Sequence, residues 1–363
     1  MDAEAKRIPM YQTIANDIQQ KILSSNFDYE NPICTERSIC EQYGVSRITA
    51  KHAITKLEDK GILYRKRGLG SFVVRHDHMP QRVFALIIPF STTQGGIFKA
   101  IRATNRILSK KGYHFTINMS HADPAQDAKL LNQLYSQNVS GIVYYPRTSE
   151  LPLESLHKFI ESNHPVVVLD KTIQHPEFAS VVCDNYKGGY LLTEHIISYG
   201  HTKTCYLSRF ATKDMPSLSD RYSGYRDCLI SAGITGEPRF VHWSDYSGNA
   251  GQSGYYMLQH IVNNLHNEGT TAIICENDEV AFNVYMCCIN LGLRIPEDIN
   301  IAGFDNIDWA TTGNAQITTV DQNFDLIGEA TAAALLVNSK PPQHKVIPVQ
   351  IIPRTSTGPL NKK

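Results

Sequence analysis

From residue 83 onward, short apolar runs alternate with segments of helical periodicity, and this alternation constrains the fold of the chain more than any other feature. The apolar runs lie at residues 83–88, 115–118, 141–145, 166–169, 180–183, 204–207, 271–275 and 299–304. Strands that alternate with helices form βαβ units, so the pattern predicts an α/β domain with parallel sheets covered by helices. Ligands of such sheets bind beyond the carboxyl ends of the strands, which makes the polar residues after each run candidates for a binding site.

The length of 363 residues leaves room for this α/β domain and for a smaller N-terminal domain. A polar, proline-containing segment at residues 77–82 predicts a linker between a domain of residues 1–76 and a domain of residues 83–363. No run of 18 apolar residues occurs, and the first residues lack the pattern of a signal peptide, so we expect a cytoplasmic protein without a membrane partner. The eight cysteines include no Cys-x-x-Cys pair and lie mostly in apolar runs, which predicts buried thiols, no metal site and no cofactor.

The N-terminal segment has the pattern of a helix that binds DNA, followed by a basic hairpin. Ser46 is a good N-cap, and an apolar stripe follows it at helical spacing, formed by Ala50, Ala53, Ile54 and Leu57. Arg47 and Lys51 share a different face of this helix, which leaves them free to enter a major groove about 12 Å wide. A first amphipathic helix containing Tyr11, Ile14, Ile18 and Ile22 and a second helix at residues 36–43, capped by Thr35, precede it. The fold predicted for residues 1–76 is a winged helix-turn-helix, an α+β domain.

The same segment resembles the DNA-binding domain of GntR-type bacterial regulators. The resemblance covers about residues 8–75 and rests on Pro9-Met10-Tyr11, Ile33-Cys34-Thr35-Glu36-Arg37, Gly44-Val45-Ser46-Arg47 and Arg67-Gly68-Leu69-Gly70-Ser71-Phe72-Val73. It implies that Arg37, Arg47, Lys51 and Gly70 approach DNA and that Gly68 shapes the wing. The candidate DNA-binding residues are Arg37, Ser46, Arg47, Ile48, Thr49, Lys51, Arg65, Lys66, Arg67, Gly68 and Gly70. Cys34, Ile48 and Lys51 depart from the residues common in the family, and the operator sequence stays open.

Charge is distributed as a DNA-binding head requires. Residues 1–76 hold 12 Lys/Arg against 9 Asp/Glu, whereas the whole chain holds 35 of each. The positive excess is therefore concentrated at one end of a chain whose formal net charge is zero. The excess is modest, which predicts modest affinity for random DNA.

The rest of the chain resembles the effector domain of LacI/GalR repressors, which is a two-lobed domain similar to periplasmic sugar-binding proteins. The resemblance spans about residues 83–356. Its motifs include Val167-Val168-Leu169-Asp170, Val182-Cys183-Asp184-Asn185, Arg221-Tyr222-Ser223-Gly224-Tyr225, Cys275-Glu276-Asn277-Asp278 and Ala302-Gly303-Phe304-Asp305-Asn306. A GntR-type head joined to a LacI-type sensor resembles the arabinose repressor family. The resemblance implies a dimer and an effector that is a sugar such as L-arabinose; a nucleoside or another metabolite is the alternative.

The chemistry of a sugar indicates which residues would bind the effector. Hydroxyl groups both donate and accept, so recognition needs carboxylates, Arg, Asn and an aromatic surface. The candidates are Phe90, Ser91, Arg221, Asn277 and Asp305. The resemblance further implies Trp243, which matches an aromatic residue that stacks on the sugar in some members, and Lys171, which stands where many members have an arginine that contacts the ligand. Packing in the core is an equal alternative for Trp243, Asp278 is expected to cap the helix at residues 279–290, and Asp184 and Asn185 are expected to tie loops at the hinge.

These features predict a ligand-responsive transcriptional repressor that binds operator DNA as a homodimer. An activator is the alternative. No Gly-x-Ser-x-Gly elbow, P-loop or cluster of metal ligands appears, so we expect neither catalytic residues nor enzyme activity. A transport receptor is disfavoured by the basic head.

Overall fold

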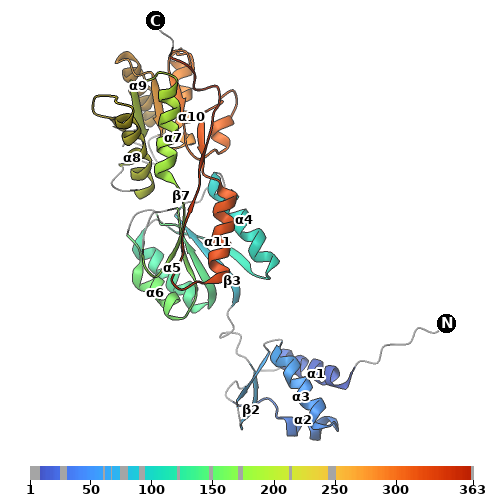
Figure 1. Ribbon diagram of the computed structural model, residues 1–363. Helices are drawn as coiled ribbons and strands as arrows, with labels where there is room; N and C mark the ends of the chain where they lie inside the picture. Colours follow the sequence, from blue (N-terminus) through green and yellow to red (C-terminus); the bar gives the residue numbers. More distant parts are fainter. Residues whose placement is uncertain are drawn as a thin grey trace, which may run out of the picture. The chain divides into compact units, whose positions relative to one another are not determined.

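Figure 1 shows the computed structural model of the protein. It describes residues 9–24, 31–59, 62–66, 68–73, 81–89, 95–120, 123–146, 150–170, 175–211, 215–243 and 251–360. The chain divides into two compact units, Met1–Gln81 and Arg82–Lys363, which we call the head and the sensor.

The head contains three helices and a two-stranded antiparallel sheet. Its elements are α1 (Met10–Ser24), α2 (Glu36–Tyr43), α3 (Arg47–Asp59), β1 (Leu63–Lys66) and β2 (Gly70–Val73). The apolar stripe predicted for α3 is buried, with Ala50, Ala53, Ile54 and Leu57 all at 1% exposure or less. It packs against Ile14 and Ile18 of α1, so the winged helix-turn-helix predicted from the sequence is confirmed.

Local signals in the sequence set the ends of α2 where we expected them. The hydroxyl of Thr35 accepts a hydrogen bond from the amide of Ser38, and the Ser38 hydroxyl accepts one from the amide of Thr35, which forms a capping box. Gly44 ends the helix at φ +64°, a left-handed conformation that glycine adopts at little cost. The turn between α2 and α3 therefore has a fixed geometry.

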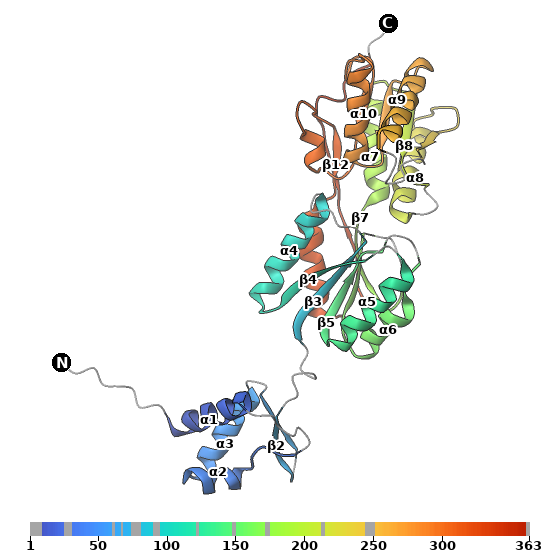
Figure 2. The same ribbon diagram turned by 180° about the vertical axis from the view of Figure 1, so that it is seen from behind.

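The sensor consists of two lobes, and the first is built on a six-stranded sheet in the order β13-β7-β6-β5-β3-β4. Its strands are β3 (Gln81–Ile88), β4 (His114–Met119), β5 (Val139–Tyr144), β6 (Val166–Leu169), β7 (Ala179–Cys183) and β13 (His344–Ile347). The pairs β3–β4, β5–β6, β6–β7 and β7–β13 are parallel. Helices α4 (Gly96–Lys110), α5 (Pro124–Ser136), α6 (Leu153–Glu161) and α11 (Phe324–Val337) cover the sheet. Both views show α11 beside α4 (Figures 1 and 2), although more than 200 residues separate them in the sequence.

The second lobe has a four-stranded parallel sheet in the order β11-β10-β8-β9. Its strands are β8 (Thr204–Ser208), β9 (Arg239–His242), β10 (Ala272–Cys275) and β11 (Asn300–Ala302), and a short antiparallel pair joins β12 (Thr319–Asp321) to β14 (Gln350–Ile352). The helices are α7 (Asn185–Ser198), α8 (Pro216–Ser231), α9 (Gly251–Asn267), α10 (Asp278–Asn290) and a short 3₁₀ helix at Asp308–Thr311. The predicted α/β fold with parallel sheets is confirmed.

Glycines allow α7 and α8 to pack unusually closely. A Cβ atom on Gly189 would lie 2.0 Å from the carbonyl oxygen of Arg221, and one on Gly224 would lie 2.1 Å from the carbonyl oxygen of Tyr186. No side chain fits at such distances. The close contact fixes Arg221, on α8, against the start of α7.

The chain passes between the lobes at three places: from β7 to α7, from β12 to α11 and from β13 to β14.

The predicted strand at 166–169 coincides with β6, and β3 begins at Gln81, two residues before its predicted start and inside the predicted linker. The predicted strand at 299–304 is shorter and spans Asn300–Ala302. All eight cysteines are free; six are buried and Cys34 and Cys40 are half-buried. Across the described residues, no helix combines the length and the apolar character needed to cross a bilayer.

Candidate DNA-binding surface and effector cavity

The N-terminal half of α3 presents its polar face to solvent. The side chain of Arg47 is 85% exposed, and Ile48 and Lys51 are also exposed. Ser46 and Thr49 instead contact each other, because the Ser46 hydroxyl accepts from the amide of Thr49 and the two hydroxyl oxygens lie 3.0 Å apart. The face that the sequence predicts as the reading surface is therefore open, with Arg47 and Lys51 as its cations.

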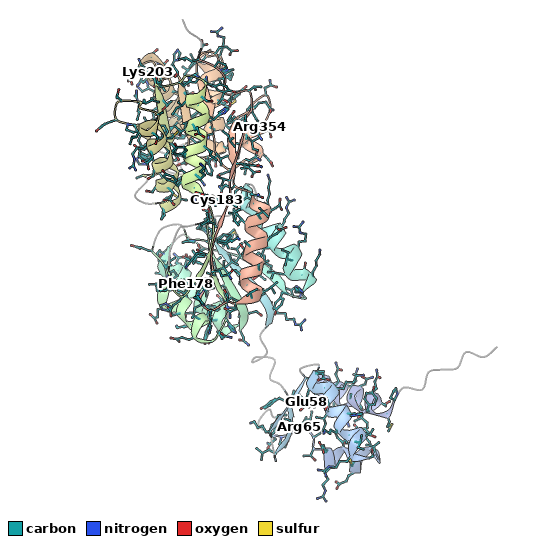
Figure 3. All side chains as sticks on the ribbon, in the orientation of Figure 1. Glu58, Arg65, Phe178, Cys183, Lys203 and Arg354 are labelled. Atoms are coloured by element: carbon teal, nitrogen blue, oxygen red, sulfur yellow. The ribbon has the colours of Figure 1, made fainter. Side chains whose placement is uncertain are left out.

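One carboxylate connects this helix to the wing. Glu36, the first residue of α2, accepts a hydrogen bond from Nε of Arg47 at 3.1 Å and lies 3.6 Å from Nη1 of Arg65 on β1. Arg65 also donates to Glu58 of α3 at 3.2 Å, and both residues are labelled in the head in Figure 3. Sequence reasoning identified the two arginines but not the Glu36 carboxylate between them.

The wing consists of β1 and β2 and the turn that joins them. The Lys66 ammonium lies 4.8 Å from the centre of the Phe72 ring, a cation–π distance. Gly70 has φ +118°, and a Cβ there would lie 2.9 Å from Cβ of Pro32, so the position requires glycine. Gly68 has φ +80°, while Arg67 lies outside the described residues. Arg37 on α2 is 89% exposed and pairs with Glu41.

The sensor contains a cavity of about 480 Å³. Both lobes line it with residues that follow the carboxyl ends of strands: Pro89 after β3, Tyr145 after β5, Asp170 after β6, Arg209 after β8, Glu276 after β10, Asp305 after β11 and Gln322 after β12. The cavity therefore lies where ligands of parallel sheets bind. Its other described lining residues are Gly95, Gly96, Ile97, Leu169, Phe210, Met215, Ser217, Leu218, Arg221, Asn277, Glu279, Ile307, Phe324 and Ile327.

Arg221 is the central cation of this cavity. It is 6% exposed, donates to Oδ1 of Asn185 at 2.8 Å and to the carbonyl of Glu276 at 2.7 Å, and lies 3.4 Å from Asp305. The guanidinium carbon sits 3.8 Å from the centre of the Phe304 ring. Burial lowers the pKa of Arg221, but the attraction of Asp305 and neighbouring groups outweighs it, so the net pKa lies above its usual value. Arg221 is a fixed, permanently charged part of the cavity wall.

Asp305 faces Arg221 from the end of β11. Its backbone has φ +110°, and its carboxylate accepts a hydrogen bond from the amide nitrogen of Gln322. Burial raises the pKa of Asp305 to about 6, although Arg221 and Gln322 oppose the rise. The carboxylate is thus a half-buried acceptor in the cavity wall and is ionised above about pH 6.

The remaining carboxylates of the described cavity wall already have donors from the protein. Tyr145 donates its hydroxyl proton to Asp170, and Glu276 accepts from the Ser208 hydroxyl and the Arg209 amide. Arg209 also donates to Glu279 at 3.2 Å. Carboxylates held in this way keep fixed orientations, which suits recognition of hydroxyl groups.

The structure brings only part of the predicted effector set to the cavity. Arg221, Asn277 and Asp305 line it. Asn277 is also the N-cap of α10, where its side chain accepts from the amide of Val280 at 2.9 Å. The expectation that Asp278 is this cap was wrong, because Asp278 is fully buried and its carboxylate instead accepts from Thr319 and from the amide of Ile307.

Trp243 does not belong to the described lining of the cavity. It is 1% exposed and packs in the apolar core of the second lobe with residues such as Leu258 and Val280, so the packing alternative describes its position. Phe90, Ser91 and Lys171 lie outside the described residues. Asp184 caps α7, and Asn185 holds Arg221.

Several lining residues escaped sequence reasoning. Four of them lie at the ends of predicted apolar runs: Tyr145 is the last residue of its run, Asp170 and Glu276 directly follow theirs, and Arg209 is the second residue after its run. A stricter use of the strand-end rule would have found them. Gln322 follows β12, which the sequence pattern did not reveal. Phe324 had no signal, because it begins a helix whose partner, α4, is far away in the sequence.

Comparisons with known proteins match one family in the head and another in the sensor. Residues 10–73 match the family described as bacterial regulatory proteins of the gntR family, and residues 193–357 match the periplasmic binding protein-like domain. An arabinose metabolism transcriptional repressor from Geobacillus stearothermophilus is 25% identical over 338 residues, which cover 91% of both chains.

Solved structures resemble the sensor. A LacI family transcriptional regulator from Enterococcus faecium with bound ribose is 25% identical, with a TM-score of 0.64 over 77% of this chain and 100% of that one. The dimeric Lac repressor is 21% identical with a TM-score of 0.64 over the same shares, a likeness of fold. The chain therefore joins a domain that matches the gntR family of bacterial regulatory proteins to a periplasmic binding protein-like domain, and it is similar to arabinose metabolism transcriptional repressors.

Proposed function

We propose that the chain is a transcriptional repressor that binds operator DNA through its head and is controlled by a small polyhydroxylated effector in the sensor cavity. One observation carries the proposal: a head with an exposed Arg47 and Lys51 on its reading helix is joined to a sensor whose strand ends enclose a cavity of about 480 Å³. A cavity of this volume is in the range of small-molecule sites. The family of the head and the repressor function of the Geobacillus relative support the proposal.

The effector in this proposal is a sugar such as L-arabinose. Asp305 and Asp170 supply acceptors, Arg221 and Arg209 supply donors, and Tyr145, Phe210 and Phe324 supply apolar surface for the C–H face of a sugar ring. The names of the relatives point the same way, because one governs arabinose metabolism and another binds ribose. Asn277, Phe90, Ser91 and Lys171 remain proposed effector contacts.

Both lobes line the cavity, so an effector that contacts both stabilises one angle between them. An effector can shift the equilibrium only by its difference in affinity for the two arrangements. We propose that the favoured arrangement in a dimer holds the two heads at a spacing that does not match the operator half-sites. The dimer, the cytoplasmic location and a division into head, sensor and a linker that ends before β3 belong to this proposal.

The DNA contacts in the proposal divide into two kinds. Arg47, Ile48 and Lys51 on the open face of α3 read base edges, whereas Arg37, Arg65, Lys66 and Arg67 contact phosphates. Ser46 and Thr49 order the first turn of α3. Gly68 and Gly70 give the wing its shape.

The experiment is a gel shift of the full chain with the DNA upstream of its own gene, repeated with a panel of pentoses, hexoses, disaccharides and nucleosides. The proposal expects a specific protein–DNA complex that dissociates when one of the sugars is added. If only a nucleoside dissociates the complex, the effector class is different from the one proposed. If the protein forms no specific complex, either with this DNA or with operators obtained by selection, the proposed repressor function is overturned. The Asp305→Asn variant is the matched control: it should bind operator and fail to respond.

A further inference from the structure

A group of two histidines and a glutamate lies in the first lobe, outside the cavity. His157 is on α6, and His175 and Glu177 lie in the segment that leads into β7. One ligand atom from each of the three side chains lies within 4.8 Å of the other two. The proposed repressor function uses none of these residues.

The geometry points to a binding site for a divalent transition metal ion such as Zn²⁺, and we propose that these three side chains are its protein ligands. Two imidazoles and one carboxylate are a donor set that zinc uses when it keeps one further position for water. Calcium and magnesium prefer oxygen donors, so two imidazole nitrogens argue against them.

The distances fit a metal with small movements. Zinc bonds of about 2.0–2.2 Å at tetrahedral angles place ligand atoms roughly 3.3–3.5 Å apart. Nε2 of His157 and Oε2 of Glu177 are 2.8 Å apart and would separate slightly, while the remaining pairs lie within 4.8 Å and would approach. The Glu177 side chain is 50% exposed, which leaves it room to adjust.

The imidazoles are held in place by aromatic packing. The His175 ring stacks on Phe178 with 4.3 Å between ring centres and 17° between the planes, and the His157 ring lies 5.5 Å from Phe178. Phe178 itself is 1% exposed and is labelled in the first lobe in Figure 3. The amide of Glu177 donates to Nδ1 of His175 at 3.4 Å, which leaves Nε2 of that ring for a ligand.

The contact between His157 and Glu177 is not an ordinary hydrogen bond. Nε2 of His157 is shielded from solvent and has no hydrogen-bond partner among the described residues, although the Glu177 oxygen is only 2.8 Å away. Sequence spacing gave no sign of this site, because 17 residues separate His157 from His175.

The test uses the full chain without an affinity tag, treated with EDTA and then freed of chelator by dialysis. Zinc is titrated, the bound metal is counted after equilibrium dialysis, and melting temperatures are recorded with and without metal. The proposal expects one zinc per chain and a rise in melting temperature of about 2 °C or more.

Variants distinguish the site from other binding. His157→Ala, His175→Ala and Glu177→Gln should each weaken zinc binding at least tenfold, while His114→Ala, an exposed histidine of β4, should bind like the wild type. Glu177→Gln changes an exposed side chain and keeps its size, so the variant should fold like the wild type. Equal melting temperatures of the two proteins without metal would verify this. Wild-type protein that binds no zinc, or zinc binding that all three variants retain, overturns the proposal.

Discussion

Arg47, the first residue of α3, donates from Nε to the Glu36 carboxylate over 3.1 Å while its side chain stays 85% exposed. The same carboxylate lies 3.6 Å from Arg65 of the wing. An exposed ion pair of this kind contributes about 0–1 kcal/mol to stability, so DNA can replace it at little cost. The pair orients the two cations of the free head without holding them back from DNA.

Replacement of Arg47 by alanine should weaken operator binding by roughly 1–3 kcal/mol, the value of a good contact to a base edge. Fluorescence anisotropy with an operator duplex and a random duplex measures it. Arg106→Ala, which removes an exposed arginine of α4 in the sensor, serves as the control and should change neither affinity. Unchanged operator affinity in Arg47→Ala would show that α3 does not read the bases.

Replacement of Glu36 by glutamine should raise affinity for random DNA by about 2- to 5-fold, because one negative charge near the phosphates is lost. The ratio of operator to random affinity should fall, since glutamine cannot orient Arg47 and Arg65 together. Glu41→Gln on the same helix removes an equal charge but contacts Arg37 instead. It should raise random binding and leave the ratio intact; equal ratios in both variants would contradict an orienting role for Glu36.

Asp305 should contribute to the free energy of unfolding a term that decreases as the pH rises from about 4 to about 6. The pKa of Asp305 is about 6 in the folded chain and 3.8 in a model peptide, so the folded chain binds the proton more tightly over this range. Stability is therefore gained where the carboxyl is protonated and is lost as pH rises through 6, by on the order of 3 kcal/mol. Urea unfolding of the wild type and of Asp305→Asn from pH 4.5 to pH 8 isolates this component as their difference.

Asp325→Asn, at an exposed position on α11, is the control for the removal of a carboxylate and should keep the wild-type pH dependence. Parallel curves for the wild type and Asp305→Asn would refute the shifted titration of Asp305.

Effector affinity should follow the opposite direction and weaken below pH 6, because a sugar hydroxyl that donates to Asp305 needs the ionised carboxylate.

Replacement of Gly224 by alanine should destabilise the sensor by about 1–3 kcal/mol or more, because the new methyl group would lie 2.1 Å from the carbonyl oxygen of Tyr186. Effector response should weaken as well, since α8 also carries Arg221. Ser231→Ala, at an exposed position at the end of the same helix, should be near neutral. Thermal unfolding of the two variants settles the point, and equal melting temperatures would count against close packing of α7 and α8.

Local signals predicted those elements whose geometry is decided nearby. The capping residue Thr35 marked the start of α2 correctly, and the apolar run at 166–169 marked β6. Four strands were missed: β9, β12, β13 and β14. They have three or four residues each, and β9, β13 and β14 are partly exposed, so their pattern is weak and their partners determine them.

The cavity shows a similar limit. Asp305 and Arg221 could be predicted because each lies in a recognisable motif, but the sequence did not show that they would pair with each other and with Asn185 and Glu276. Trp243 was misleading because an aromatic side chain suits an apolar core and a ligand site equally well. The neighbourhood of each side chain depends on contacts distant in sequence, and spacing alone does not encode them.

The first lobe is completed by the last part of the chain, since β13 pairs with β7 and α11 packs against α4. During synthesis, the second lobe from α7 to β12 leaves the ribosome before these two elements do, and only β14 of that lobe follows them. Until then β7 is an open sheet edge, and the apolar face later covered by α11 is bare, which is the state in which sheets associate wrongly. A stop codon near residue 320 would therefore damage the half of the sensor that had been translated first.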